Sequence, residues 1–158
     1  MLEPDLQRLF GEMNQQLVRL AASIVGPDDA ADVVAATFAR QSERGMAAVE
    51  NHRAYLFRAV ANESISHQRS VRRRLARNAR FLRLNQRPSP TVSTRDFDVE
   101  RALDRLSPQQ RLIVHLTYWE DHTSGSIASL LGVSEGSIKK QLARARKTLR
   151  EELGYGNA

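Results

Sequence analysis

The first feature of the chain is a run of hydrophobic positions spaced three and four residues apart. Positions at this spacing lie on one side of an α-helix, so the pattern predicts an amphipathic helix with an apolar stripe formed by Leu6, Phe10, Met13, Leu17, Leu20 and Ile24. Gly26-Pro27-Asp28 follows this helix. Because glycine suits a helix end, proline a first turn and aspartate an N-cap, we expect one helix to end and the next to begin there.

Two more helices are expected in the first half of the chain. One runs from about Asp29 to Ser42, with inward positions at Val33, Val34, Thr37 and Phe38. Residues 43–51 are expected to form a loop. The other helix starts near Arg53, continues into a stretch rich in arginine, and buries Leu56, Ala59 and Val60. Residues 1–84 are therefore expected to form a small helical domain.

A polar segment follows this domain. Residues 85–98, NQRPSPTVSTRDFD, contain two prolines and no helical periodicity, which predicts a flexible linker. Beyond it, Ser107-Pro108-Gln109-Gln110 has the pattern of a capping box at the start of a helix. No segment of the chain alternates like a strand. We therefore predict an all-α fold with two separately folded, mutually mobile domains, residues 1–84 and 99–158.

The most specific motif lies in the second domain. A short helix carries Ile127, Ala128, Leu130 and Leu131, and Gly132 can end it in the left-handed conformation. Val133 fills the corner and Ser134 can cap a second helix. Two helices joined by such a short turn predict a helix-turn-helix.

The second helix of this motif has one apolar and one cationic side. Its core stripe is Ile138, Leu142, Ala145 and Leu149. Such a charge run is often only a solvated surface, but together with the turn and the preceding helix it favours DNA binding in a major groove. The candidate DNA-binding residues are Ser137, Lys139, Lys140, Arg144, Arg146 and Lys147.

Charge is unevenly distributed along the chain, which has a net charge of +6. Residues 1–57 hold five arginines and eight acids, whereas residues 58–87 hold nine arginines and one acid, Glu63. Residues 134–150 hold six lysines or arginines and one acid, Glu135. Two basic blocks therefore follow an acidic beginning. They indicate a polyanionic partner, and each block is expected to have its own nucleic-acid contact.

Several function classes are disfavoured by the sequence. The chain has no cysteine, and its four histidines, His52, His67, His115 and His122, have neither the spacing of a metal site nor a nucleophile partner. No phosphate-binding loop or nucleophile elbow is present. We expect no metal, no cofactor and no enzymatic activity. The chain has no long apolar run and begins without a signal-peptide pattern, so we expect a cytoplasmic protein.

The motifs in the second domain resemble a known family. LDRLSPQQRLIVHLTYWE (103–120) and IASLLGVSEGSIKKQLARARKTLREEL (127–153) resemble region 4 of the extracytoplasmic-function (ECF) sigma factors of bacterial RNA polymerase. In the first domain, LVRLAASIVGPDDAADVVAATF (17–38) and RAYLFRAVAN (53–62) are similar to region 2. The resemblance implies that the helix-turn-helix binds the minus-thirty-five promoter element.

The resemblance also implies roles for the first domain. Asn62 is expected near an unpaired base of the minus-ten element, and Tyr55 is either a core residue or a platform on which that base stacks. Phosphate contacts are implied for Arg69, Arg72, Arg73 and Arg74. Docking on core polymerase is implied for Asp29, Asp32, Val33 and Phe38, although Ala35 and Ala36 replace polar family residues there.

The partners expected from this interpretation are core RNA polymerase, promoter DNA and an anti-sigma factor. A stand-alone regulator that binds duplex operators through the helix-turn-helix is the alternative. It accounts for the second domain but leaves the arginine block at residues 58–87 without a role.

Overall fold

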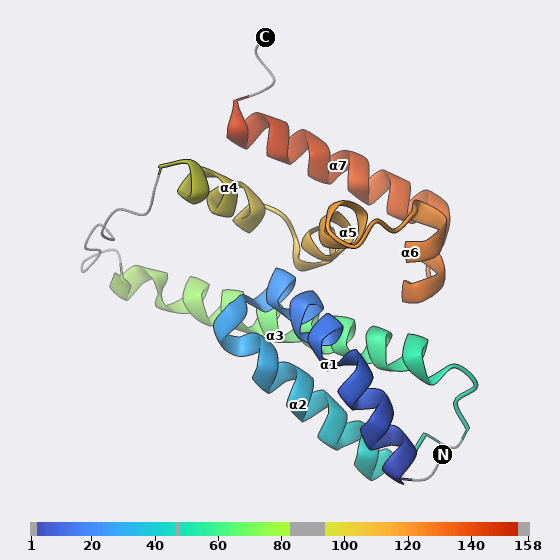
Figure 1. The fold of residues 1–158 in the computed structure, drawn as a ribbon. Helices are drawn as coiled ribbons and strands as arrows, with labels where there is room; N and C mark the ends of the chain where they lie inside the picture. Colours follow the sequence, from blue (N-terminus) through green and yellow to red (C-terminus); the bar gives the residue numbers. More distant parts are fainter. Residues whose placement is uncertain (1–2, 47, 83–93, 155–158) are drawn as a thin grey trace.

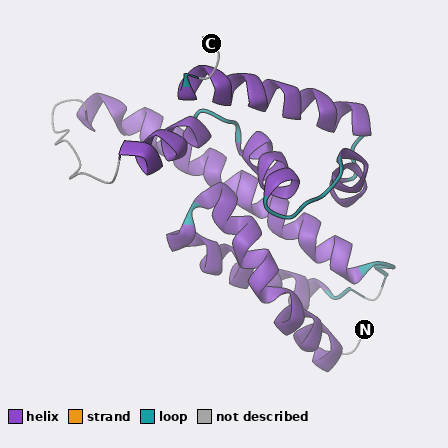
Figure 2. Cartoon of the chain, turned by 45° about the horizontal axis from the view of Figure 1, so that its top comes forward, coloured by secondary structure: helices purple, strands orange, loops and turns teal. Residues whose placement is uncertain are grey.

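Helices make up all the regular structure in the part of the chain that the computed structural model describes, residues 3–46, 48–82 and 94–154 (Figure 2). In chain order they are α1 (Glu3–Val25), α2 (Pro27–Arg44), α3 (His52–Leu82), α4 (Thr94–Asp104), α5 (Pro108–Tyr118), α6 (Ser124–Leu131) and α7 (Glu135–Leu153). Figure 1 shows α1–α3 packed together in one half of the molecule and α4–α7 in the other. The predicted all-α fold is confirmed.

Helices α1 and α2 pack side by side, joined at Gly26. The φ angle of Gly26 is 87°, which favours glycine, and Pro27 takes the first helical position as predicted. The N-cap of α2 is Gly26 rather than the expected aspartate. Asp28 lies in the first turn instead, where the helix dipole stabilises a carboxylate. The predicted stripe of α1 is buried, except that Phe10 is only partly buried and packs against Phe38.

Side-chain caps fix the helix starts in the second half. The predicted capping box is confirmed: the Gln110 backbone N–H donates to Ser107 Oγ at 3.2 Å, and the Ser107 N–H donates to Gln110 Oε1 at 3.1 Å. The hydroxyl of Thr123 caps α6 by accepting from the Ser126 N–H, and that of Ser134 caps α7 by accepting from the Ser137 N–H. Gly132 ends α6 in the left-handed conformation with a φ of 69°. Helices α6 and α7 therefore form the predicted helix-turn-helix.

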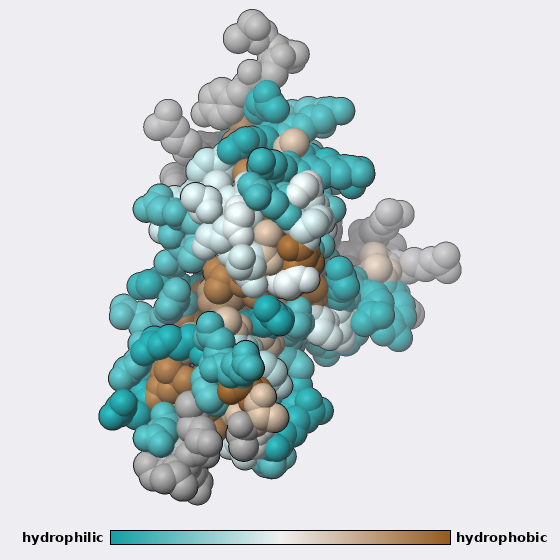
Figure 3. Space-filling model, turned by 90° about the vertical axis from the view of Figure 1, so that its right-hand side faces the viewer, coloured by the Kyte–Doolittle hydropathy of each residue, from teal (hydrophilic) through white to brown (hydrophobic). Residues whose placement is uncertain are grey.

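The two halves of the molecule pack against each other. Helix α1 contacts α5, and α3 contacts α5 and α6. The buried hydrophobic side chains form one cluster with members from both halves. In the space-filling view, apolar side chains show in the middle of one face and again near its lower end (Figure 3). Helices α1, α3, α5 and α6 supply this contact, and the separate folding and mutual mobility of the two domains stay a prediction.

The start of α4 also differs from the prediction. Helix α4 begins at Thr94, so the last five residues of the predicted linker, 94–98, are helical. Residues 85–93 lie outside the described residues, and the flexibility of that segment stays a prediction. None of the described helices is long and apolar enough to cross a lipid bilayer.

Candidate nucleic-acid interface

Helix α7 has the two-sided character that the sequence predicts. Ile138, Leu142 and Ala145 are buried, and Leu149 is partly buried against the same core. The cationic candidates Lys139, Lys140, Arg144, Arg146 and Lys147 are all exposed, and Ser137 is partly exposed. Gly136, also on this side, has no neighbour within 4 Å of the place where a Cβ would lie, so the backbone there is open to a close partner.

Two of these cations have partners in the chain itself. Lys139 Nζ lies 3.3 Å from Glu135 Oε1 one turn earlier. Arg146 Nε donates to the hydroxyl of Tyr118 at 2.7 Å, and its guanidinium lies 5.8 Å from the centre of that ring. Within the described residues, no ion pair engages Lys140, Arg144 or Lys147. These three side chains are the ones most available to phosphates or base edges.

A second candidate site is a hollow of about 230 Å³ between α2 and α3, here called the α2–α3 hollow. Asn62, for which the resemblance implies a place near an unpaired base, and Tyr55, the possible stacking platform, both line it, although they lie two helical turns apart. Tyr55 is partly buried and Asn62 is exposed. The full lining is Gln41, Tyr55, Arg58, Ala59, Asn62 and Glu63.

Two residues of the α2–α3 hollow were missed by the sequence analysis. Gln41 is 6% exposed, and its Oε1 has no hydrogen-bond partner, which is costly for a buried acceptor. Its spacing from Val34 and Thr37 puts it on the buried side of α2, so a polar residue in an apolar stripe was the available indication. Arg58 was counted only as part of the basic block. Glu63, which also lines the hollow, is ion-paired with Arg40 of α2.

The four arginines assigned to phosphate contacts differ in their surroundings. Arg69, Arg73 and Arg74 are exposed on α3, beside the exposed Leu75. Arg72 instead donates to the backbone carbonyl oxygens of Leu106 at 3.0 Å and Asp104 at 3.3 Å. Arg72 therefore joins the two halves in this structure.

Three of the four residues assigned to polymerase docking lie together on α2. Asp29, Asp32 and Val33 line one hollow of about 270 Å³, and Asp29 Oδ2 lies 3.2 Å from His67 Nε2. Both aspartates are exposed. Phe38 does not line this hollow. Its ring centroid lies 4.0 Å from that of Phe10, so it packs between α1 and α2.

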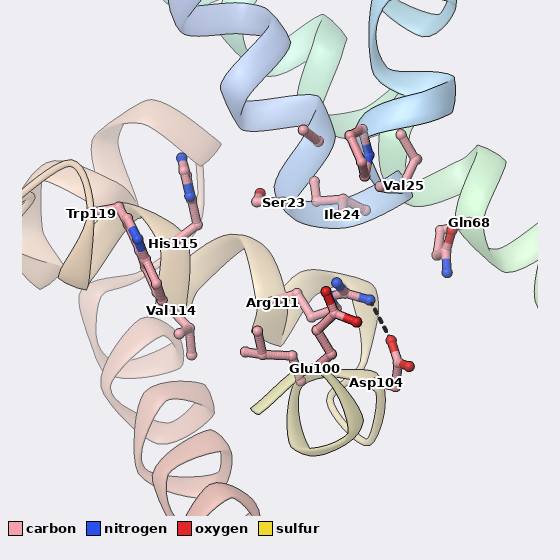
Figure 4. A pocket seen from close by; sticks show the side chains of 14 residues that line it. Ser23, Ile24, Val25, Gln68, Glu100, Asp104, Arg111, Val114, His115 and Trp119 are labelled. Atoms are coloured by element: carbon pink, nitrogen blue, oxygen red, sulfur yellow. Dashed lines mark hydrogen bonds and ion pairs between the residues drawn. The ribbon is translucent and has the colours of Figure 1, made fainter. Parts of the chain in front are cut away.

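A cavity of about 440 Å³ lies where the two halves meet (Figure 4). Arg111 Nη1 donates to Asp104 Oδ1 at 3.2 Å on one side of it, and the ring of His115 stacks on Trp119 on the other. Burial lowers the pKa of His115, and Glu120, whose Oε1 lies 3.4 Å from Nε2, partly offsets this. A metal-binding group of His, Cys, Asp and Glu is absent from the described residues.

Known proteins with similar sequences are sigma factors of bacterial RNA polymerase. The model of the sigma-70 region 4 family matches residues 96–149. The chain is similar to RNA polymerase sigma-E factor of Streptomyces coelicolor, with 34% identity over 147 residues, 87% of this chain and 79% of the relative. It is 30% identical over 165 residues to ECF RNA polymerase sigma factor SigL of Mycobacterium tuberculosis, 94% of this chain and 90% of the relative.

A solved structure shares the fold. It is the co-crystal structure of the sigma factor RpoE in complex with the anti-sigma factor NepR from Bartonella quintana. The TM-score is 0.62 at 24% identity, and the match covers 97% of this chain and 99% of that chain.

The helical fold and its helix-turn-helix thus define a sigma-70-type transcription factor. More closely, the chain belongs to the ECF RNA polymerase sigma factors. It is a transcription initiation factor, which binds core RNA polymerase and recognises promoter DNA, rather than a classical enzyme. This membership favours the sigma-factor interpretation over the stand-alone regulator.

Proposed function

We propose that the two candidate sites act on two separate promoter elements. Helix α7 lies in the major groove of the minus-thirty-five element, with Lys140, Arg144 and Lys147 as its main contacts. The α2–α3 hollow captures one unpaired base of the minus-ten element, with Tyr55 as the stacking platform and Asn62 as the polar contact. No bond is made or broken; binding energy from these side chains offsets the unstacking of the base.

The observation that carries this proposal is the α2–α3 hollow itself. The family resemblance implies that Asn62 lies near the base and allows Tyr55 to be its stacking platform, and both residues line this hollow together with the cation Arg58. An aromatic ring, an amide and a guanidinium can supply stacking, hydrogen bonding to a base edge, and charge for a phosphate. A duplex-binding helix-turn-helix protein has no need of such a site.

The remaining surfaces are assigned to core polymerase and to the DNA backbone. Asp29, Asp32 and Val33 form the contact with core polymerase, and Phe38 supports that surface from the core. Arg69, Arg73 and Arg74 follow the DNA backbone next to the hollow. Activity takes place in the cytoplasm with core polymerase, and an anti-sigma factor controls it, as the partner of the structurally similar RpoE suggests.

The experiment compares Asn62→Ala with wild type in holoenzyme made from the full chain and core polymerase. The variant should keep its polymerase affinity but lose promoter opening on fully paired templates. A template already mismatched at the minus-ten element should partly rescue it, because the unstacking cost of a few kcal/mol is then removed in advance.

Asn14→Ala is the matched control, because Asn14 is an exposed amide of α1 outside the hollow. It should open both templates as wild type does. Equal loss of activity by Asn62→Ala on both templates would contradict the base-capture role.

A further inference from the structure

Arg58 lies between the α2–α3 hollow and the helix-turn-helix. It lines the hollow with Tyr55 and Asn62, yet its Nε donates to the carbonyl oxygen of Leu130 at 3.1 Å. Its Nη2 donates to the carbonyl oxygen of Ser129 at 3.4 Å. A single side chain of the first half thus reaches the C-terminal end of α6 in the second half.

The turn of the helix-turn-helix is shaped to admit this side chain. A Cβ added at Gly132 would lie 3.3 Å from Arg58 Cζ, closer than nine in ten such contacts. Gly132 also has a φ of 69°, which disfavours other residues. Arg58 therefore reaches α6 across a glycine, where any larger residue would require the guanidinium to shift by a few tenths of an ångström.

The present partners of Arg58 are weaker than a phosphate would be. Both are neutral carbonyl groups, which carry only the partial negative charge of a helix C-terminus. The carboxylate in the hollow, Glu63, is already ion-paired with Arg40. A phosphate oxygen offers a full charge and accepts the two parallel hydrogen bonds that a guanidinium makes best.

We propose that Arg58 binds the backbone phosphate of the captured nucleotide and must leave the α6 carbonyls to do so. This inference rests on the proposed function of the α2–α3 hollow. Packing of the helix-turn-helix on α3 and capture of the unpaired strand then exclude each other at one residue. Strand capture separates the two halves, and their closure disfavours it.

The test measures closure and capture separately for Arg58→Ala, Arg58→Lys and wild type. The chain has no cysteine, so Ser42→Cys on α2 and Glu151→Cys on α7, both exposed, provide clean dye positions. Energy transfer between the dyes in the free full-length chain reports closure. Binding of a single-stranded minus-ten oligonucleotide by the holoenzyme reports capture, with polymerase affinity as the check that each variant folds.

Arg58→Ala should lower energy transfer in the free chain and weaken oligonucleotide binding about tenfold, the loss of one charge-assisted contact. Arg58→Lys should keep part of the binding, because it retains the charge but not the paired hydrogen bonds. In wild type, saturating oligonucleotide should itself lower the energy transfer.

Arg19→Glu is the control for closure alone. Arg19 Nε lies 3.5 Å from Glu120 Oε1 across the two halves and outside the hollow, so this variant should lower energy transfer without weakening capture.

Two results overturn the inference and leave the proposed function intact. Unchanged capture in Arg58→Ala would mean that Arg58 only joins the halves, and unchanged energy transfer would mean that it does not hold them. Wild-type capture by Asn62→Ala would instead overturn the proposed function, and the inference with it.

Discussion

Arg72 of α3 donates a hydrogen bond of 3.0 Å to the carbonyl oxygen of Leu106, just before α5 begins. The resemblance implies a DNA phosphate contact for Arg72, but in this structure its guanidinium binds backbone carbonyls of the other half of the molecule. Its neighbour Arg73 is exposed and forms no ion pair among the described residues. Two adjacent arginines with the same expected role thus differ in what their removal should do.

Arg72→Ala should lower the free energy of unfolding by about 1 kcal/mol, because it leaves carbonyl oxygens without their donor. Arg73→Ala should leave it unchanged. If both bind promoter phosphates, each should also reduce the slope of log affinity against log salt by about one unit. Urea unfolding measures the stability of each variant, and salt titration of promoter binding measures the slope. An equal loss of stability in both variants would contradict a stabilising role for the hydrogen bonds of Arg72.

On α7, Lys140→Ala and Arg144→Ala should each weaken binding to the minus-thirty-five element by about 1–3 kcal/mol if they contact base edges. Arg146→Ala should weaken binding to this element less, because the Arg146 side chain is already hydrogen-bonded to the Tyr118 hydroxyl. Competition between specific and unrelated duplexes, measured with holoenzyme, separates base from phosphate contacts. Full promoter activity in the double variant of Lys140 and Arg144 would show that this side of α7 does not contact the minus-thirty-five element.

The buried His115 predicts how stability depends on pH. Its pKa is lowered from the ordinary value of 6.5, chiefly because burial disfavours the imidazolium, and Arg19 adds to this while Glu120 opposes it. The unfolded chain therefore takes up a proton near pH 6.5 that the native chain resists. The free energy of unfolding should fall as the pH drops below about 6.5, until the native pKa is reached.

His115→Gln removes this contribution. Between about pH 7.5 and about pH 5.5, thermal unfolding of the variant should shift less than that of wild type. A larger acid shift in the variant would mean that Glu120 outweighs burial and raises the pKa of His115.

The unsatisfied Gln41 predicts a stabilising substitution. Gln41→Met has a similar length and removes the buried acceptor, so the free energy of unfolding should rise by about 1 kcal/mol. Thr37→Val is the control, because the Thr37 hydroxyl already donates to the Val33 carbonyl at 2.7 Å and its removal should bring no gain. Calorimetry measures the free energy of unfolding of the two variants. Destabilisation by Gln41→Met would show that the Gln41 amide forms hydrogen bonds in solution.

Local structure was predictable because short-range rules fix it. The stripe of α1, the capping box at Ser107 and the turn at Gly132 all follow from residue type and spacing, and all are confirmed. The packing of the two halves was not predictable, because it depends on which helix surfaces meet. Arg72 illustrates this: two arginines follow it in the sequence, and its structural partners lie 32 and 34 residues away.

The candidate site was predictable only in part. Tyr55 and Asn62 came from a family resemblance, and their common hollow supports the pairing. Gln41 and Arg58 were missed, because one contributes through a buried unsatisfied oxygen and the other through contacts more than seventy residues away. Neither property can be read from local sequence.

The most direct test of the central claim is a crosslink from the α2–α3 hollow to DNA. Tyr55 is replaced by the photoreactive aromatic residue benzoylphenylalanine in the full chain, and open complexes are irradiated with core polymerase on a promoter. The control places the same residue at Trp119, which is 63% exposed and lies at the cavity between the halves. We predict a crosslink from position 55 to one unpaired nucleotide of the minus-ten element, and none there from position 119. A crosslink from position 55 only to paired DNA, or to none, would contradict the account.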